Sequence, residues 1–201
     1  MSSAGRPLGR QAVPMPALAT LLLRFWRRGL HRLREQARAF GPSARLRRIL
    51  YAFDLRAREL PLTTTAVEFR ELSRDEIRAQ SSQLGAGGRN VGEALTPGSG
   101  CVVGHLDGQK VYHAWYVRAA VDAMHGLPQS WRPHGRVLFL HDGYTEPAFR
   151  GRGIHTAATH WLLERERGTD VTYAVCVVHA DNVVAARAVE RVGFRPVARI
   201  E

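Results

Sequence analysis

Residues 149–155 have the residue types of an anion-binding turn. Gly151 and Gly153 remove side chains where the backbone must come close to a ligand, and Arg150 and Arg152 add positive charge. The apolar spacing that follows predicts a helix, whose first-turn N–H groups lack partners within the helix and carry partial positive charge. This arrangement suits a pyrophosphate. The alternative is a tight turn that uses its glycines for geometry alone.

Titratable side chains precede this turn at the end of an apolar run. His141 and Asp142 are candidate proton acceptors for an amine, as is His179 at the end of the next apolar run, and Tyr144 is the nearest candidate proton donor. Glu146 is close in sequence, and we expect it to face the turn. The structural alternatives remain open: strand-end polar residues for the histidines, a turn former for Asp142, and packing for Tyr144.

A longer pattern surrounds these residues. TEPAFRGRGIHTAA is followed by an apolar run and then by HADNVVAARAVERVGF. Over residues 65–201 the chain resembles the GNAT superfamily of acetyl-CoA-dependent N-acyltransferases. The residues that carry the resemblance, in the family's order and spacing, are Pro147, Arg150, Gly151, Gly153, Asn182, Gly193 and Phe194.

The resemblance implies an α/β fold, or α+β in view of its mixed sheet. The central mixed β-sheet would have two splayed strands and would be flanked by helices. It implies that acetyl-CoA, or another acyl-CoA, is the acyl donor and that no metal is needed. Asn182 would contact the coenzyme, or would cap the helix that it begins. The expected coenzyme-binding residues are Tyr144, Thr145, Arg150, Gly151, Arg152, Gly153, Ile154, His155 and Asn182.

Three features depart from the family's pattern. His155 stands where the family usually has a small residue. Val189 stands where many members have a tyrosine whose hydroxyl protonates the departing thiolate. The family usually ends on a seventh strand, whereas this chain reaches Glu201 after the sixth expected strand. An open sheet edge needs covering, and our hypothesis is that the basic N-terminal arm or a second subunit, as in a homodimer, covers it.

The function that the resemblance implies is N-acyl transfer by direct attack of a primary amine on the thioester. The acceptor would be a small molecule, an amino sugar or a peptide, and the candidate catalytic residues are His141, Asp142 and Tyr144. Two alternatives stay open. Val189 fits a non-catalytic, regulatory acyl-CoA-binding protein on the same scaffold, and the basic arm fits an acyltransferase that uses an acyl carrier protein at the membrane.

The elements that must position these residues follow from residue patterns. Ser73 and Glu76 form a capping-box pattern that predicts a helix start, and Leu106-Asp107-Gly108 predicts a hairpin turn. We expect a loop over residues 85–100 and helices over 119–125, from 154 onward, and over 181–192. The expected strands cover residues 66–72, 100–105, 110–118, 136–144, 171–179 and 194–200.

Composition limits the class of protein. The 201 residues are 45% hydrophobic and 23% charged, which suits one packed domain with an extension. No apolar run approaches the roughly 18 to 20 residues of a membrane-spanning helix. Two cysteines, Cys101 and Cys176, exclude a disulfide framework and a four-cysteine zinc site. We therefore expect a reducing, cytoplasmic compartment.

The positive charge is concentrated in an N-terminal arm. Residues 1–60 hold 13 basic and three acidic residues, a net charge of +10, whereas residues 61–201 hold 16 and 15, a net charge of +1. Apolar spacing predicts helices over 16–40 and 43–60, so we divide the chain into an arm (1–62) and a GNAT-like domain (63–201). Residues 16–60 would bind an anionic membrane surface or an acidic protein, or would pack on the domain; nucleic acid is the less favoured partner.

Overall fold

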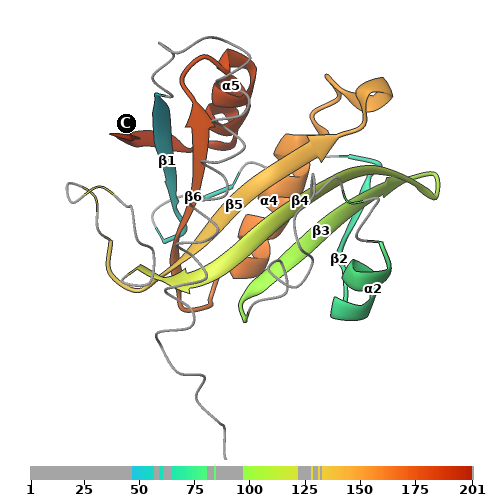
Figure 1. Cartoon of the computed structure of the whole chain (residues 1–201), viewed down its shortest axis with the longest axis horizontal. Coiled ribbons are helices and arrows are strands. Elements are labelled where there is room, and N and C mark those ends of the chain that lie inside the picture. Colours follow the sequence, from blue (N-terminus) through green and yellow to red (C-terminus); the bar gives the residue numbers. More distant parts are fainter. Residues whose placement is uncertain are drawn as a thin grey trace, which may run out of the picture.

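The computed structural model describes residues 47–56, 59–60, 65–80, 84, 97–121, 128, 131 and 133–200. Within these residues, seven strands form one mixed sheet in the order β2-β3-β4-β5-β6-β1-β7 (Figure 1). The strands are β1 (Arg48–Asp54), β2 (Glu68–Glu71), β3 (Ser99–Leu106), β4 (Gln109–Ala120), β5 (Arg136–Thr145), β6 (Val171–His179) and β7 (Arg195–Ile200). The helices are α2 (Arg74–Ala79), the short 3₁₀ helix η2 (Pro147–Phe149), α4 (Ile154–Glu166) and α5 (Val183–Val192). The expected mixed sheet flanked by helices is confirmed.

Strands β2 to β5 are antiparallel neighbours. The predicted hairpin between β3 and β4 is confirmed, and its turn is a two-residue loop with positive φ at both Asp107 (51°) and Gly108 (77°). Such a loop matches the right-handed twist of the strands that it joins. The capping box is also confirmed, because the Ser73 hydroxyl accepts a hydrogen bond from the Glu76 N–H and the Glu76 carboxylate accepts one from the Ser73 N–H.

The expected helix over residues 43–60 is wrong, because Arg48–Asp54 forms strand β1. β1 lies between β6 and β7 and is antiparallel to both, with Tyr51 opposite Cys176 on one side and Pro196 on the other. Most of its residues are buried, so its apolar run is continuous, and a short continuous run has no period that separates strand from helix. β1 supplies the strand that the family pattern left missing, and the sheet crosses the predicted boundary at residues 62 and 63.

Two further expectations need correction. β4 continues to Ala120, so the helix expected over 119–125 is wrong at its start, where Ala119 pairs with Val137. Ser99, expected within the loop, begins β3 one residue before the strand start predicted at Gly100. The helix expected over 16–40, and the rest of the arm up to residue 46, lie outside the described residues. None of the described helices has the length and apolar character to cross a membrane.

Helices α4 and α5 pack on the sheet and place the turn that begins α4. α4 lies behind β4 and β5 in Figure 1, and its buried Leu162 and Leu163 share one apolar core with Phe53, Leu138 and Phe194. At the far end of α4, the buried Glu166 carboxylate accepts a hydrogen bond from Arg118 Nε on β4 at 2.8 Å. These contacts fix the helix at both its middle and its C-terminus, and so fix the direction in which its N-terminus points.

Candidate functional site

Strands β5 and β6 separate partway along their length. They form a parallel ladder from Arg136 opposite Val171 to Leu140 opposite Cys176. β5 then continues with β4 as its partner, and β6 continues with β1. In the described part of the chain, residues 141–145 therefore have no strand on the β6 side, which leaves backbone hydrogen-bonding groups along an open edge. The splayed strands that the resemblance implies are present (Figure 1).

A cavity of about 250 Å³ occupies this divergence. β5 and β6 form its walls, and Ala158 and Leu162 of α4 and Val189 of α5 contribute to its apolar lining. The polar residues that line it are Tyr112, His141, Asp142, His155, Thr159, His179 and Asn182. Of the predicted catalytic residues, the structure brings His141 and Asp142 to the cavity, and Tyr144 is not among the lining residues.

A β-bulge shapes the β5 wall. His113 pairs with Tyr144 and Trp115 pairs with His141, so Ala114 alone faces the two residues Asp142 and Gly143. Asp142 has φ of +49°, a left-handed conformation that aspartate tolerates better than most residues. Bulges turn side chains and backbone groups away from the regular ladder and are frequent beside active sites. This bulge lies where β5 has lost β6 as its partner.

His141 and Asp142 form a pair at the bulge. His141 Nδ1 lies 3.1 Å from Asp142 Oδ2, and the His141 ring stacks on Phe139 with 5.5 Å between ring centroids. A carboxylate that accepts the Nδ1 proton orients the imidazole and leaves Nε2 as the basic nitrogen. The pair therefore has the arrangement of a general base with an orienting carboxylate.

Tyr144 belongs to a second group, outside the cavity. Its ring stacks on His113 at 5.4 Å between centroids, and the Arg150 guanidinium lies 5.5 Å from the Tyr144 centroid. Arg150 Nε donates a hydrogen bond to the Thr145 carbonyl at 3.0 Å. Burial lowers the pKa of His113 to about 4, with Lys110 adding to the effect, so this imidazole is neutral near pH 7. The group ties the end of β5 to the turn.

The turn has the geometry that its sequence predicts. Gly151 and Gly153 have φ of +77° and +74°, and a Cβ on either would meet nothing within 4 Å. The glycines are thus needed for backbone conformation, and the space around them is open. Gly153 is the N-cap of α4 and has no side chain to cap the helix, so the first-turn N–H groups face this open space.

Asn182 serves as a helix cap. Its Oδ1 accepts a hydrogen bond from the Ala185 N–H at 3.1 Å, which favours the structural alternative for this residue, although Asn182 also lines the cavity. Gly193 ends α5 with φ of +110°, as the family pattern requires. Beside Asn182, Val183 and Val184 are 52% and 79% exposed, which makes this helix start an unusual apolar surface.

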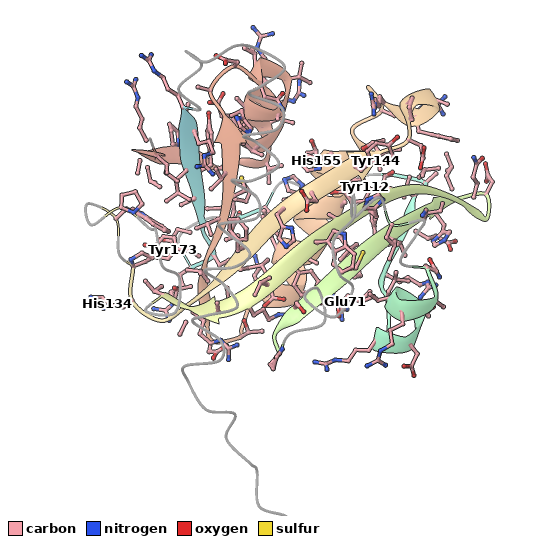
Figure 2. All side chains as sticks on the ribbon, viewed as in Figure 1. Glu71, Tyr112, His134, Tyr144, His155 and Tyr173 are labelled. Carbon is pink, nitrogen blue, oxygen red and sulfur yellow. The ribbon has the colours of Figure 1, made fainter. Side chains whose placement is uncertain are left out.

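A tyrosine that sequence reasoning missed lies on the cavity. Tyr112 Oη is 3.0 Å from His155 Nδ1, and Tyr112 is buried. Figure 2 labels both residues. Burial raises the pKa of Tyr112 and lowers that of His155, so both are neutral near pH 7. The sequence could have indicated Tyr112 through the alternation of side chains along the strand, which puts Tyr112 on the same face as Ala114. Its partner, His155, is among the expected coenzyme-binding residues, but no sequence pattern links it to Tyr112.

The other aromatic residues of β4 belong to the core. Trp115 and Tyr116 are each 3% exposed and pack in separate apolar clusters. Tyr116 fills the space above Gly100, where any Cβ would collide with its ring. Neither residue lines the cavity. Among the residues that the structure describes, no three His, Cys, Asp or Glu side chains gather as metal ligands.

Comparison with solved structures shows the same fold at low sequence identity. A GCN5-related N-acetyltransferase from Kribbella flavida is 18% identical with a TM-score of 0.51, over 76% of this chain and 55% of that one. The aminoglycoside 6'-N-acetyltransferase AAC(6')-Ih from Acinetobacter baumannii is 15% identical with a TM-score of 0.51, over 67% and 95%. AAC(6')-Iy is 18% identical with a TM-score of 0.50, over 68% and 96%.

No curated protein matches the sequence. This chain spans little more than half of the Kribbella structure, at 55% of its length. The model of the acetyltransferase (GNAT) family matches residues 57–194, which include the splayed strands, the turn and both helices that flank the cavity. The chain belongs to the acetyltransferase (GNAT) family.

Proposed function

We propose that the protein transfers an acyl group from acetyl-CoA, or from another acyl-CoA, to a primary amine. The observation that carries the proposal is the open edge of β5 at residues 141–145, which faces a cavity and leads directly to the glycine turn at the start of α4. AAC(6')-Iy, which has the same fold, was solved with a bisubstrate analogue that contains CoA. The arrangement here fits the same donor.

The residues fit each part of that donor. The first-turn N–H groups of α4, with Arg150 and Arg152 beside them, suit a pyrophosphate. The part of β5 beyond Leu140, which has no strand on the β6 side among the described residues, suits the amide groups of pantetheine, which would pair with it as an added strand does. Gly151 and Gly153 leave the approach clear of side chains. Asn182 remains a candidate contact through its backbone, because its side chain caps α5.

We assign the chemistry of the acceptor to His141 and Asp142. A primary amine is protonated near neutral pH and must lose a proton before it attacks a carbonyl. His141 accepts that proton at Nε2, while Asp142 orients the ring through Nδ1. The backbone N–H groups of the bulge stabilise the charge that develops on the carbonyl oxygen. Most of the rate enhancement then comes from holding amine and thioester together.

The acceptor class is a small molecule, an amino sugar or a peptide with a primary amine. AAC(6')-Ih, which has the same fold, is an aminoglycoside antibiotic 6'-N-acetyltransferase, and this supports a small-molecule acceptor. A non-catalytic acyl-CoA-binding protein is the second candidate, and Val189 on the cavity, in place of a tyrosine, favours it.

Calorimetry and hydrogen exchange with acetyl-CoA test the proposal. We expect binding at submillimolar concentrations and slower exchange of those amides of residues 143–145 that point away from β4 and gain a partner, but unchanged exchange of residues 136–140, which already pair with β6. Absence of binding at millimolar acetyl-CoA contradicts the proposal. Binding without thiol release across a panel of amines favours the second candidate.

We further propose that the N-terminal arm binds an anionic membrane surface at the cytoplasmic face. Residues 1–46 contain nine arginines and one acidic residue. The full chain is expected to bind vesicles that contain anionic lipid, and less so as salt increases, whereas a chain that begins at residue 47 is not. The deletion stops at residue 46 because β1 belongs to the sheet. Equal binding by both chains contradicts this role.

A further inference from the structure

The cavity has no tyrosine at position 189 to assist the departure of CoA. Val189 lines the cavity and offers no proton. The Tyr112–His155 pair lines the same cavity, and beyond the expected contact of His155 with the coenzyme the proposed function gives the pair no part in the chemistry. Its position is set by Gly143 of the bulge, because a Cβ there would lie 3.0 Å from His155 Cε1 and 3.1 Å from Nδ1. The imidazole thus occupies the space directly beside the β5 backbone proposed to hold the thioester.

The hydrogen bond fixes the tautomer of His155. Tyr112 is 2% exposed, and the proton of a buried hydroxyl needs an acceptor. Nδ1 of His155, at 3.0 Å, is the acceptor within reach in the described part of the chain. When Tyr112 donates to Nδ1, the single proton of the neutral ring resides on Nε2.

The position of His155 also keeps the ring neutral. It is the second residue of α4, where the positive end of the helix disfavours a cation. Burial acts in the same direction and lowers its pKa. A neutral imidazole with a fixed Nε2–H is a donor that keeps its proton, as in enzymes where such a ring polarises a carbonyl or stabilises an anion.

We propose that His155, oriented by Tyr112, donates an Nε2–H hydrogen bond to the leaving sulfur of the acyl-CoA thioester; this inference rests on the proposed function. The amine nitrogen bonds to the acyl carbon, the carbon–sulfur bond breaks, and its electron pair passes to sulfur. The ammonium proton leaves through His141 to water before the attack, and the proton that the adduct nitrogen sheds afterwards goes to His141, which is then neutral again. His155 keeps its proton, and the thiolate takes one from water after release. His155 is then a catalytic residue and Tyr112 a positioning residue.

The test uses CoA alone and needs no acceptor. A hydrogen bond to the charged form of a group lowers its pKa, and a donor to the thiolate is expected to lower the pKa of the bound CoA thiol by about one to two units. The ultraviolet absorbance of the thiolate is titrated with CoA bound, against S-methyl-CoA as the blank. Burial raises the pKa of Cys101 and of Cys176 to about 12, so the protein's own thiols stay protonated through this range.

Four variants separate the donor from the packing. His155→Gln carries an N–H near the position of Nε2 and is expected to keep the low thiol pKa. His155→Leu and His155→Asn have no N–H donor at the position of Nε2, and both are expected to raise the pKa of the bound thiol by about one to two units. Tyr112→Phe keeps the aromatic ring of residue 112 but no longer fixes the tautomer of His155. The pKa of the bound thiol is therefore expected to lie between the values of the parent and of His155→Leu. The other charged and titratable groups around the ligand are unchanged in every variant: Arg150, Arg152, His141, Asp142, Cys176 and His179.

The outcomes are distinct. A bound thiol with the same pKa in the parent, Gln, Asn and Leu proteins overturns the inference while leaving the proposed function intact. Failure of the parent to bind CoA removes the proposed function instead. Circular dichroism and thermal unfolding check each variant for folding, and if His155→Leu does not fold, the comparison of Gln with Asn decides, since both are polar and differ in where the donor lies.

Discussion

At the scale of single residues, the turn before α4 depends on two positive φ angles. Gly153→Ala introduces a Cβ into open space, so its cost is backbone strain of about 1–2 kcal/mol without a steric clash. Relief of that strain would rotate the first-turn N–H groups, so we expect CoA affinity to fall at least about tenfold. Urea unfolding and calorimetry measure the two effects.

Gly168→Ala is the matched control. Gly168 has φ of +79° and open space around its Cβ position, but it follows the other end of α4. We expect the same loss of stability and an unchanged affinity for CoA. Equal losses of affinity in both variants would show that general destabilisation, not the local backbone at the turn, controls binding.

The His141–Asp142 pair makes a second prediction at this scale. His141→Gln removes the base and is expected to lower kcat/KM roughly a hundredfold with an amine found in the panel. Asp142→Asn keeps a residue that tolerates the +49° φ and removes the orienting charge, so a smaller loss is expected. Thiol release from acetyl-CoA is the measurement. Asp170→Asn, which removes an exposed carboxylate that pairs with Arg136, is the control and should leave the rate unchanged.

At the scale of elements, β1 decides whether the region before residue 62 is part of the fold. Phe53 is 1% exposed and its ring centroid lies 5.6 Å from that of Phe194. Phe53→Ala is therefore expected to lower the free energy of unfolding by about 3–5 kcal/mol, as for other buried aromatic residues. Val184→Ala, at a 79% exposed position, should change it little. Similar small effects in urea unfolding for both variants would mean that β1 is peripheral.

The elements that the sequence predicted share a local cause. The Asp107-Gly108 turn, the Ser73 cap and the glycine ends of α4 and α5 are each set by residues within one turn of chain. β1 was not predictable in this way, because its strand character comes from burial on both faces between β6 and β7, which are more than 100 residues away in sequence. The 3–4 spacing of its apolar residues fits a helix equally well.

The residues of the site also divide into those set by their neighbours in sequence and those set by contacts between distant parts of the chain. The turn and the His141–Asp142 pair follow from neighbours in sequence and were predictable. The Tyr112–His155 hydrogen bond joins residues 43 positions apart, on β4 and α4, and exists because Gly143 of a third element, β5, leaves room for the ring. Such a three-part contact has no sequence signature. Tyr144 is the opposite case, a candidate from the sequence that the structure places outside the cavity. Its position depends on the bulge, which shifts the register of β5 against β4.

At the scale of the whole molecule, buried and partly buried histidines make the fold sensitive to acid. Burial is the largest cause that lowers the pKa of His113, His155, His160 and His179, and for His113 the value is about 4. In the unfolded chain a histidine titrates near 6.5. Between these values the unfolded state binds more protons than the folded state, so the free energy of unfolding falls as the pH falls.

The stability of the molecule should therefore be fully present above about pH 6.5 and decline toward pH 4. His113 alone accounts for a decline on the order of 3 kcal/mol, because it is 4% exposed and little screened by solvent. Protonation also adds charge to a chain that is already at +11, and this repulsion acts in the same direction. Urea unfolding across this range measures the slope, and His113→Phe, which keeps the stacking on Tyr144, should make it shallower by one proton. A slope that is flat in the parent, or unchanged in His113→Phe, would mean that these rings are hydrated in the folded state.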